Sequence, residues 1–212
     1  MHSQIYEAIY TISDAINENK EMLTNLDAAI GDADHGINMS RGFDAVRAKL
    51  LDSGEEDISA VLKKVGMTLI STVGGASGPL YGTAFLRASS AAQGAGFITR
   101  EKAMEMLSAA IQGIKDRGKA VKGEKTMLDA LEPALEAFSR GIKEDKSLTD
   151  CLESACKAAE EGVEYTKTIK ATKGRASYLG ERSIGHQDPG ATSSLILLKV
   201  LKDYCKSSIR EA

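Results

Sequence analysis

The stretch that separates the first two helical segments of this chain reads Gly31-Asp32-Ala33-Asp34-His35-Gly36, and Asp27 lies five residues before Asp32. Three carboxylates this close in sequence repel one another unless a cation lies among them. Oxygen ligands without cysteine favour Mg²⁺, Mn²⁺ or Ca²⁺ over zinc. We therefore predict that Asp27, Asp32 and Asp34 hold one or two magnesium ions that bridge to phosphate oxygens. Helix capping and solvated turns are the alternative role for these aspartates.

Composition indicates a helical protein with a sizeable core. The chain has 212 residues, of which 42% are hydrophobic and 5% aromatic, and it contains no tryptophan. Its abundant alanine, leucine, lysine and glutamate favour helices over strands. A formal net charge of −3 gives no polybasic surface for nucleic acid or anionic membranes. No apolar run approaches the roughly 20 residues of a membrane-spanning helix, so neither nucleic acid nor membrane is an expected partner.

The cysteines and the first residues favour a cytoplasmic location. Cys151 and Cys156 are five positions apart, Cys205 stands alone, and the sequence has no Cys-x-x-Cys pair. This pattern provides neither a disulfide framework nor a zinc site, and it is typical of reduced thiols in the cytosol. The segment from Met1 to Glu7 has no signal-peptide pattern. We therefore expect a cytoplasmic protein.

Apolar residues at helical spacing, together with capping residues, predict about eight helices and no strands. The expected helices are the first at residues 3–25, the second from Asn38 through Leu50, the third from Asp57 through Leu69, the fourth from Pro79, the fifth from Thr99 to about Asp116, the sixth after Lys125 to about Ile142 with Pro133 inside it, the seventh from Ser147 to Thr168, and the eighth from Pro189 with Asp188 as its N-cap.

Short connections imply that neighbouring helices are antiparallel, and no linker or low-complexity tract divides the chain. The expected fold is therefore an all-α, single-domain, antiparallel up-and-down bundle or barrel over residues 1–212. Alternate loops of such a bundle lie at the same end. The unusual sequence is confined to four loops that would share one end, namely residues 27–36, 74–79, 117–125 and 173–188. We predict that this end carries the functional site.

Two of these loops have features suited to phosphate. The run Gly74-Gly75-Ala76-Ser77-Gly78 precedes a predicted helix, where consecutive backbone N–H groups can bind an anion. A purely structural glycine turn is the alternative. The loop at residues 173–187 contains Lys173, Arg175, Arg182 and His186, whose positive charges suit transferred phosphoryl groups. A solvated loop is the alternative there.

Three further side-chain predictions concern the same end. His35 lies beside three carboxylates, which favours its cationic form when metal is absent. It is expected either to contact phosphate or metal-bound water, or to form a hydrogen bond within its own loop. The lysines Lys119, Lys122 and Lys125 are expected to form a solvated patch. Met127, at a predicted helix start, is placed to line a base pocket.

Four motifs occur along the chain in a fixed order: Asp27-x4-Asp32-Ala33-Asp34-His35-Gly36, then Gly74-Gly75-Ala76-Ser77-Gly78-Pro79, then Gly174-Arg175-Ala176-Ser177-Tyr178-Leu179-Gly180-Glu181-Arg182-Ser183, then Gly185-His186-Gln187-Asp188-Pro189-Gly190-Ala191. Together they strongly resemble one family, the nucleotide-binding L subunits of bacterial dihydroxyacetone kinases (DhaL), nearly from end to end. The carboxylate motif alone is shared with broader relatives, which include a domain of fatty-acid kinases. The last two motifs narrow the resemblance to DhaL.

The resemblance implies an antiparallel eight-helix barrel with ADP and two magnesium ions at one end. It implies that Asp27, Asp32 and Asp34 are the metal ligands. Arg175 and His35 are carried over as candidate catalytic residues. The nucleotide contacts of the family fall on His35, Gly36, Ile37, Asn38, Ala76, Ser77, Gly118, Met127, Arg175, Asp188, Pro189 and Gly190.

The resemblance also implies a reaction. With a nucleotide site that begins near residue 27, this sequence leaves no room for a second domain that would hold a ketone, so it looks like the phosphotransferase-system version of the enzyme. In that version ADP stays bound as a coenzyme, and a phosphohistidine on an M subunit converts it to ATP. The phosphoryl group then passes to dihydroxyacetone held by a K subunit. Phosphoenolpyruvate is the ultimate donor, and dihydroxyacetone phosphate is the product.

Two other functions stay open at this point. One is the nucleotide domain of a fatty-acid-kinase-like system, in which the partner binds lipid. The other is a nucleotide-sensing module that binds a transcription regulator, a role that some L subunits are expected to combine with kinase activity. Co-purification of a K-type subunit favours the kinase, whereas a DNA-binding protein favours the regulator.

Overall fold

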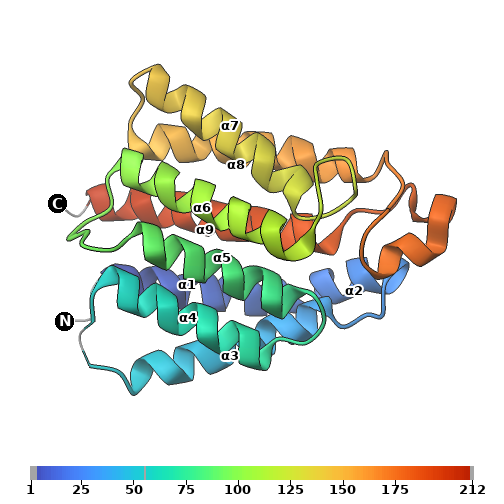
Figure 1. Cartoon of the computed structure of the whole chain (residues 1–212), viewed down its shortest axis with the longest axis horizontal. Helices are drawn as coiled ribbons and strands as arrows, with labels where there is room; N and C mark the ends of the chain where they lie inside the picture. Colours follow the sequence, from blue (N-terminus) through green and yellow to red (C-terminus); the bar gives the residue numbers. More distant parts are fainter. Residues whose placement is uncertain (1–3, 55, 211–212) are drawn as a thin grey trace.

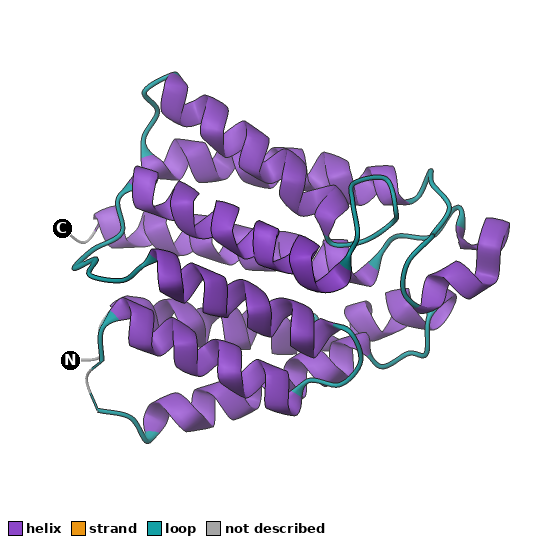
Figure 2. Cartoon of the chain, viewed as in Figure 1, coloured by secondary structure: helices purple, strands orange, loops and turns teal. Residues whose placement is uncertain are grey.

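The computed structural model describes residues 4–54 and 56–210. Within these residues the chain forms α-helices and one 3₁₀ helix, with no strand (Figure 2). The elements in chain order are α1 (Gln4–Glu18), α2 (Lys20–Ile30), α3 (His35–Leu51), α4 (Ile58–Thr72), α5 (Ser77–Ala91), α6 (Arg100–Gly118), α7 (Leu128–Lys143), α8 (Leu148–Thr166), the 3₁₀ helix η1 (Arg175–Ser183) and α9 (Pro189–Arg210).

Eight of the helices form a closed ring. The order around the ring is α1, α3, α4, α5, α6, α7, α8 and α9. Each helix packs against the next, and α9 packs against α1 to close the ring. Short connections make consecutive members antiparallel, which confirms the predicted all-α up-and-down barrel. The start of α1 and the end of α9 lie at one end of the barrel, and α2 and η1 extend beyond the other end (Figure 1).

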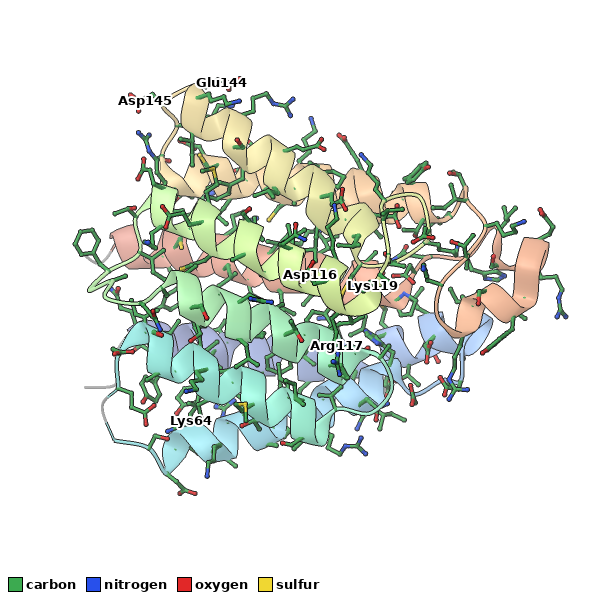
Figure 3. The ribbon with its side chains drawn as sticks, viewed as in Figure 1. Lys64, Asp116, Arg117, Lys119, Glu144 and Asp145 are labelled. Atoms are coloured by element: carbon green, nitrogen blue, oxygen red, sulfur yellow. The ribbon has the colours of Figure 1, made fainter. Side chains whose placement is uncertain are left out.

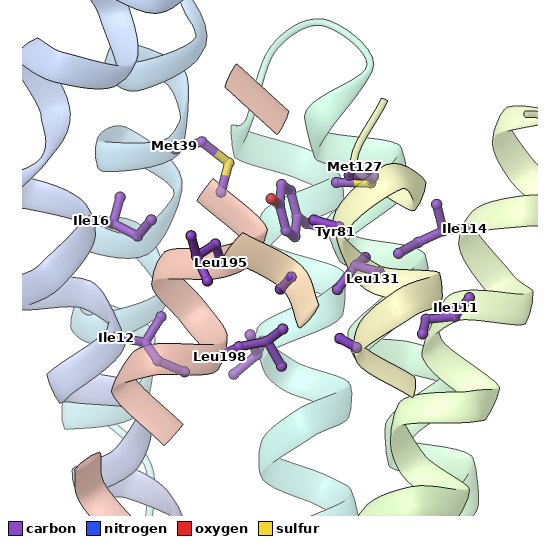
Figure 4. Packing of buried hydrophobic residues seen from close by; sticks show 14 of the residues in the cluster. Ile12, Ile16, Met39, Tyr81, Ile111, Ile114, Met127, Leu131, Leu195 and Leu198 are labelled. Carbon is purple, nitrogen blue, oxygen red and sulfur yellow. The ribbon is translucent and has the colours of Figure 1, made fainter. Parts of the chain in front are cut away.

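The core fills the interior of this ring. Along α1 the buried residues Ile9, Ile12 and Ile16 recur at helical spacing, and Figure 4 shows Ile12 and Ile16 in one cluster with Leu195 and Leu198 of α9. Burial of apolar surface from every ring helix is the main favourable contribution to folding. The ring is therefore rigid enough to fix the positions of its loops.

Capping residues explain several helix boundaries. Asp57, Thr99 and Ser147 each accept a hydrogen bond from the backbone N–H three residues later, at the starts of α4, α6 and α8. This satisfies one of the free N–H groups that every helix start presents. These three starts agree with the sequence-based expectation.

The structure corrects the expected helices in two places. The single helix expected at residues 3–25 is two helices that meet at Asn19, whose side-chain amide donates to the carbonyl of Ala15. The second of them runs on to Ile30, so Asp27 is a helical residue rather than a loop residue. The expected start at Ser3 lies outside the described residues.

The second correction concerns the expected polar loop at residues 173–187, most of which is the 3₁₀ helix η1. Its apolar residues Ala176 and Leu179 pack with Ile30 of α2 and with Ala171. The short turn is also supported by Ser177, whose hydroxyl donates to the Gly174 carbonyl 2.6 Å away. Short polar helices of this kind have no apolar periodicity to reveal them.

A close approach between α7 and α8 tests the packing of the ring. A Cβ at Gly162 of α8 would lie 2.1 Å from the carbonyl oxygen of Asp129 on α7, whereas a Cβ at Gly96 would meet nothing within 4 Å. We expect Gly162→Ala to lower the free energy of unfolding by about 1–3 kcal/mol, because the two backbones must separate. Chemical denaturation measures this. Gly96→Ala is the control, and an equal effect of both changes would contradict the packing.

Candidate functional site

The four unusual loops meet at the barrel end that carries α2 and η1, where they surround a cavity of about 410 Å³. This volume is typical of sites for small ligands and cofactors. Its wall includes Gly74 and Gly75 from the loop before α5, and Lys173 and Gly174 from the segment before η1. Figure 3 shows Arg117 and Lys119 where α6 reaches this end of the barrel. The predicted convergence of the four loops is confirmed.

Asp27, Asp32 and Asp34 form a cluster at this cavity. One ligand atom from each of them lies within 4.8 Å of the other two. Asp27 comes from α2, whereas Asp32 and Asp34 come from the short connection to α3. Oxygen donors alone, at this spacing, suit a hard divalent cation such as Mg²⁺. The residues therefore fit the metal that the sequence predicts.

The backbone around Asp27 holds this cluster in place. Asp27 Oδ2 accepts hydrogen bonds from the backbone N–H groups of Asp34, at 2.9 Å, and His35, at 3.2 Å. Ala33 has a positive φ of 61°, so the backbone turns sharply between Asp32 and Asp34. A left-handed residue other than glycine costs about 1–3 kcal/mol and is typical of functional sites.

Arg175 lies directly against the carboxylate cluster. Its Nε is 2.7 Å from Asp32 Oδ2, and the two side chains are 67% and 36% exposed. Arg175 is the first residue of η1, which explains how a residue so distant in sequence reaches Asp32. A guanidinium at this position can also contact phosphate oxygens, since its planar donors match them. The site therefore brings an exposed positive charge next to the predicted metal position.

His35 is buried and neutral, which corrects the expectation of a cationic imidazole. Burial lowers the pKa of His35 to about 4, and the nearby Asp27 opposes this only in part. Its Nδ1 lies 3.0 Å from the hydroxyl of Ser77, and its Nε2 lies 2.9 Å from the hydroxyl of Ser193. Both ring nitrogens are thus engaged by hydroxyl groups of α5 and α9. The ring also lines the cavity.

The hydroxyl chain continues behind His35. Ser193 Oγ is 2.7 Å from the hydroxyl of Tyr81, and that hydroxyl is 2.9 Å from Ser194 Oγ. Tyr81 is 3% exposed, and burial raises its pKa to about 12. Neither Tyr81 nor Ser193 was singled out from the sequence, since each reads as an ordinary helix residue.

Asp188 is a second buried carboxylate in the cavity wall. It is the N-cap of α9, as predicted, and its Oδ2 accepts from the Ala191 N–H at 2.6 Å. Burial raises the pKa of Asp188 to about 7 and outweighs the hydrogen bond from Ala191. The neighbouring carboxylate of Asp129 adds to the increase, whereas Lys125 opposes it.

Lys125 corrects a second expectation, because it is 1% exposed rather than part of a solvated patch. Its ammonium donates to the carbonyl oxygens of Thr166, Ile169 and His186. Burial lowers the pKa of Lys125, and Asp188 opposes this effect. Lys125 therefore ties the loop after α6 to the segment between α8 and α9. Its neighbours Lys119 and Lys122 are exposed, as predicted.

Asp129 completes this tie from the first turn of α7. Its Oδ1 accepts from the Gly123 N–H, at 2.5 Å, and its Oδ2 accepts from the Thr126 N–H, at 2.8 Å. The side chain is fully buried. Sequence analysis missed Asp129, although an aspartate three residues after a threonine at a helix start is a recognisable capping signal.

Most of the predicted site residues line the cavity. The cavity wall includes Asp27, Asp32, Asp34, His35, Ala76, Ser77, Gly118, Met127, Arg175, Asp188, Pro189 and Gly190. The wall does not include Gly36, Ile37 or Asn38.

These three residues have other positions on α3. A Cβ at Gly36 would lie 2.1 Å from the Lys20 carbonyl, so Gly36 allows α3 to pack closely against α2. Ile37 is 45% exposed. Asn38 is buried, and its Oδ1 accepts from Arg41 Nη2 at 2.7 Å. A Cβ at Gly74 would lie 3.1 Å from the Asn38 amide, so Asn38 supports the glycine loop from below.

Because the Lys125 ammonium connects two segments of the chain, we expect its removal to lower the stability of the fold. Lys125→Met removes the donor to three carbonyl groups, of which the one on Thr166 is in a buried contact and the other two are in partly buried contacts, and we expect the free energy of unfolding to fall by about 1–3 kcal/mol. Urea denaturation measures the change. The matched control is Lys119→Met at an exposed lysine of the same loop, for which we expect no change beyond about 0.5 kcal/mol. Equal stability of the two variants would show that the tie is unimportant.

Asp188 predicts a specific pH dependence. Its folded pKa of about 7 lies above the unfolded value of 3.8, so the native state binds this proton more tightly than the unfolded state. The stabilisation is complete below about pH 4 and is lost as the pH rises through about 7. We expect the wild type to lose stability relative to Asp188→Asn over this range, since asparagine still accepts from Ala191. Urea titrations of both proteins with parallel pH profiles would exclude this account.

Comparison with known proteins places this site in a family. Residues 29–203 match the DAK2 domain. The chain is 47% identical over 199 residues to the ADP-binding subunit DhaL of the PEP-dependent dihydroxyacetone kinase of Escherichia coli (strain K12). This alignment covers 94% of this chain and 95% of that subunit. It is 46% identical over 189 residues to the ADP-binding subunit DhaL of the PTS-dependent dihydroxyacetone kinase of Lactococcus lactis subsp. lactis (strain IL1403). This alignment covers 89% of this chain and 90% of that subunit.

A solved structure shares the fold. The dihydroxyacetone kinase of C. freundii, in complex with AMP-PNP and Mg²⁺, superimposes with a TM-score of 0.74 at 23% identity. The match covers 96% of this chain and 34% of the kinase chain, so this chain spans about a third of that protein's length. Because the match to the DAK2 domain and the identity to the bacterial subunits both extend over most of the sequence, this chain belongs to the DAK2 domain family, in its DhaL group of dihydroxyacetone kinase subunits.

Proposed function

We propose that this chain, as a single domain over residues 1–212, is the nucleotide-binding subunit of a PEP-dependent dihydroxyacetone kinase and carries Mg-ADP or Mg-ATP as a bound coenzyme. The observation that supports this most strongly is the cluster of Asp27, Asp32 and Asp34, within 4.8 Å of one another, at a cavity bordered by the glycine loop before α5. Relatives of similar length are named as ADP-binding subunits of such kinases. A cytoplasmic location is part of the same proposal.

The aspartates would hold magnesium, and two ions are the number that we propose. Asp27 uses Oδ2 for the two backbone N–H groups at the start of α3, which leaves Oδ1 for a cation. Asp32 and Asp34 offer carboxylates beside it. Magnesium neutralises the charge of phosphate oxygens and so favours phosphoryl transfer.

The rest of the cavity suits a nucleotide. Its wall joins apolar residues, among them Leu80, Ile114 and Met127, to the polar loops at its mouth. An apolar wall accommodates a base, and the starts of α5 and α9 present backbone N–H groups to the phosphates. Arg175 and Ser77 line the cavity near the aspartates and add side-chain donors. Together these residues can orient a nucleotide with its phosphates at the cluster.

The proposed partners follow from the same chemistry. A phosphohistidine on an M subunit would supply the phosphoryl group, and dihydroxyacetone on a K subunit would accept it to give dihydroxyacetone phosphate. Phosphoryl transfer depends on positioning and charge neutralisation more than on a protein nucleophile. The exposed side of the site carries Arg175 and η1, where a partner can approach.

A direct test identifies the coenzyme. The protein is purified in magnesium, denatured, and the released small molecules are separated by ion-exchange chromatography. We expect close to one adenine nucleotide per chain, mainly ADP. The absence of any nucleotide, together with no binding of added Mg-ADP by calorimetry, would overturn the proposal.

A variant tests the metal assignment. We expect Asp32→Asn to reduce phosphoryl transfer from phosphoenolpyruvate to dihydroxyacetone, in a system reconstituted with M and K subunits, by more than about 100-fold. The helical circular dichroism should be unchanged, because Asp32 is partly exposed and lies in a loop. The matched control is Asp52→Asn at the exposed end of α3. Near-normal turnover of Asp32→Asn at saturating magnesium would refute the assignment.

A further inference from the structure

The chain between α8 and α9 forms a loop whose two ends are held together. We call this segment, residues 167–187, the η1 loop, because it carries η1 beyond the end of the barrel (Figure 1). Two backbone N–H groups close its neck. That of Gly185 donates to the Lys167 carbonyl at 2.7 Å, and that of Asp188 donates to the Thr166 hydroxyl at 3.0 Å. The η1 loop therefore leaves the barrel and returns to it at one place.

Lys125 lies in this neck, although it belongs to the connection between α6 and α7. Its ammonium donates to the carbonyl oxygens of Thr166 and Ile169, where the η1 loop begins, and to that of His186, where the loop ends. An ammonium group has three protons, so these three acceptors use all of them. Lys125 lines the cavity, yet it has no proton left for a phosphate oxygen. Through its hydrogen bonds it acts on the site by holding the surrounding chain in place.

The backbone of Lys125 has a conformation that lysine seldom adopts. Its φ is 61°, in the left-handed region that favours glycine. Residues held in this region are typical of functional sites, where the surrounding contacts determine their conformation. Lys119, in the same connection, has a φ of 50°, but it is exposed. The two lysines share residue type and backbone region and differ in burial, which makes Lys119 the matched control.

The neck borders three parts of the cavity wall. Met127, two residues after Lys125, lines the cavity from the start of α7, and Gly190 lines it from the start of α9. A Cβ at Gly190 would lie 3.7 Å from Met127 Cβ, so these two parts lie against each other. Arg175 adds the third part from the η1 loop. Opening of the wall at the η1 loop requires the Lys125 ammonium to release carbonyl groups, which then lack their donor.

We propose that Lys125 is a positioning residue that keeps the coenzyme resident: by closing the neck of the η1 loop, it slows the release of Mg-ADP from the cavity. The identity of the ligand rests on the proposed function, whereas the closed neck rests on the contacts above. Arg175 and the start of α9 can contact a ligand only while the neck holds them at the cavity. A looser neck therefore removes contacts of the bound state, and such losses change mainly the dissociation rate.

Amide hydrogen exchange tests the neck in the absence of nucleotide. In ligand-free Lys125→Met we expect the amides of Gly185 and Asp188 to exchange about tenfold faster than in the wild type, because opening the neck no longer breaks the contacts of the ammonium. Ile9→Val, a change in the core at α1, controls for a general loss of stability and should alter these two amides by less than about twofold. Unchanged exchange at both amides in Lys125→Met would contradict a neck closed by Lys125.

The release of Mg-ADP tests the consequence. The protein is loaded with radiolabelled Mg-ADP and chased with an excess of unlabelled Mg-ADP, so that the loss of label gives the dissociation rate. We expect Lys125→Met to release the label about tenfold faster or more, with the association rate changed by no more than about threefold. Lys119→Met should release it at the wild-type rate. If Lys125→Met releases it no faster than Ile9→Val, Lys125 serves stability alone and the proposal is wrong.

A second substitution keeps the test decisive if methionine prevents folding. Lys125→Gly also removes the ammonium, but glycine suits the positive φ at this position. Its exchange and release should be as fast as those expected for Lys125→Met, and release at the wild-type rate would again refute the proposal. If the wild type binds no Mg-ADP, the proposed function fails, whereas amide exchange still decides whether Lys125 closes the neck. If the wild type binds Mg-ADP and neither variant releases it faster, the positioning role alone fails.

Discussion

The site depends on one junction, at which the Asp27 carboxylate accepts the backbone N–H groups of Asp34 and His35. These N–H groups lie on the N-cap and the first residue of α3, and they would otherwise lack an intrahelical partner. One oxygen of Asp27 therefore fixes where α3 begins, and the other remains beside Asp32 and Asp34. The same turn places His35 beneath the glycine loop. The start of a helix, the carboxylate cluster and the buried imidazole are thus set by a single side chain.

Closure of the ring brings a second helix start to the end of the barrel where this junction lies. Because α9 packs against both α1 and α8, the start of α9 is brought to the same end as the start of α3. Buried charges then fix the loops between them, since Lys125 binds carbonyl groups on both sides and Asp129 holds the backbone of its own loop. Buried polar groups are costly unless they are fully paired. Loops held in this way are rigid enough to present backbone donors in a fixed geometry.

Sequence patterns predicted the parts of this protein that depend on local rules. Apolar periodicity and caps such as Asp57 and Asp188 gave the ring helices, and antiparallel order gave the convergence of the four loops. The missed features depend on contacts between segments distant in sequence. Lys125 belongs to a lysine-rich loop and was assigned to solvent, because its three acceptors lie more than forty residues away. The same holds for the neutral state of His35, which burial by α5 and α9 decides.

The charged groups of the site fall into two classes with different mobility. Asp27, Lys125 and Asp188 are buried and hydrogen-bonded, so any movement would leave unpaired groups behind. The Arg175 pair with Asp32 is exposed, and pairs of this kind are worth about 0–1 kcal/mol. Arg175 can therefore leave Asp32 at little cost when a cation binds there, and its guanidinium then becomes available to phosphate. A rigid floor with an exchangeable positive charge at its mouth suits a subunit that must hold a nucleotide firmly while its terminal phosphate stays accessible.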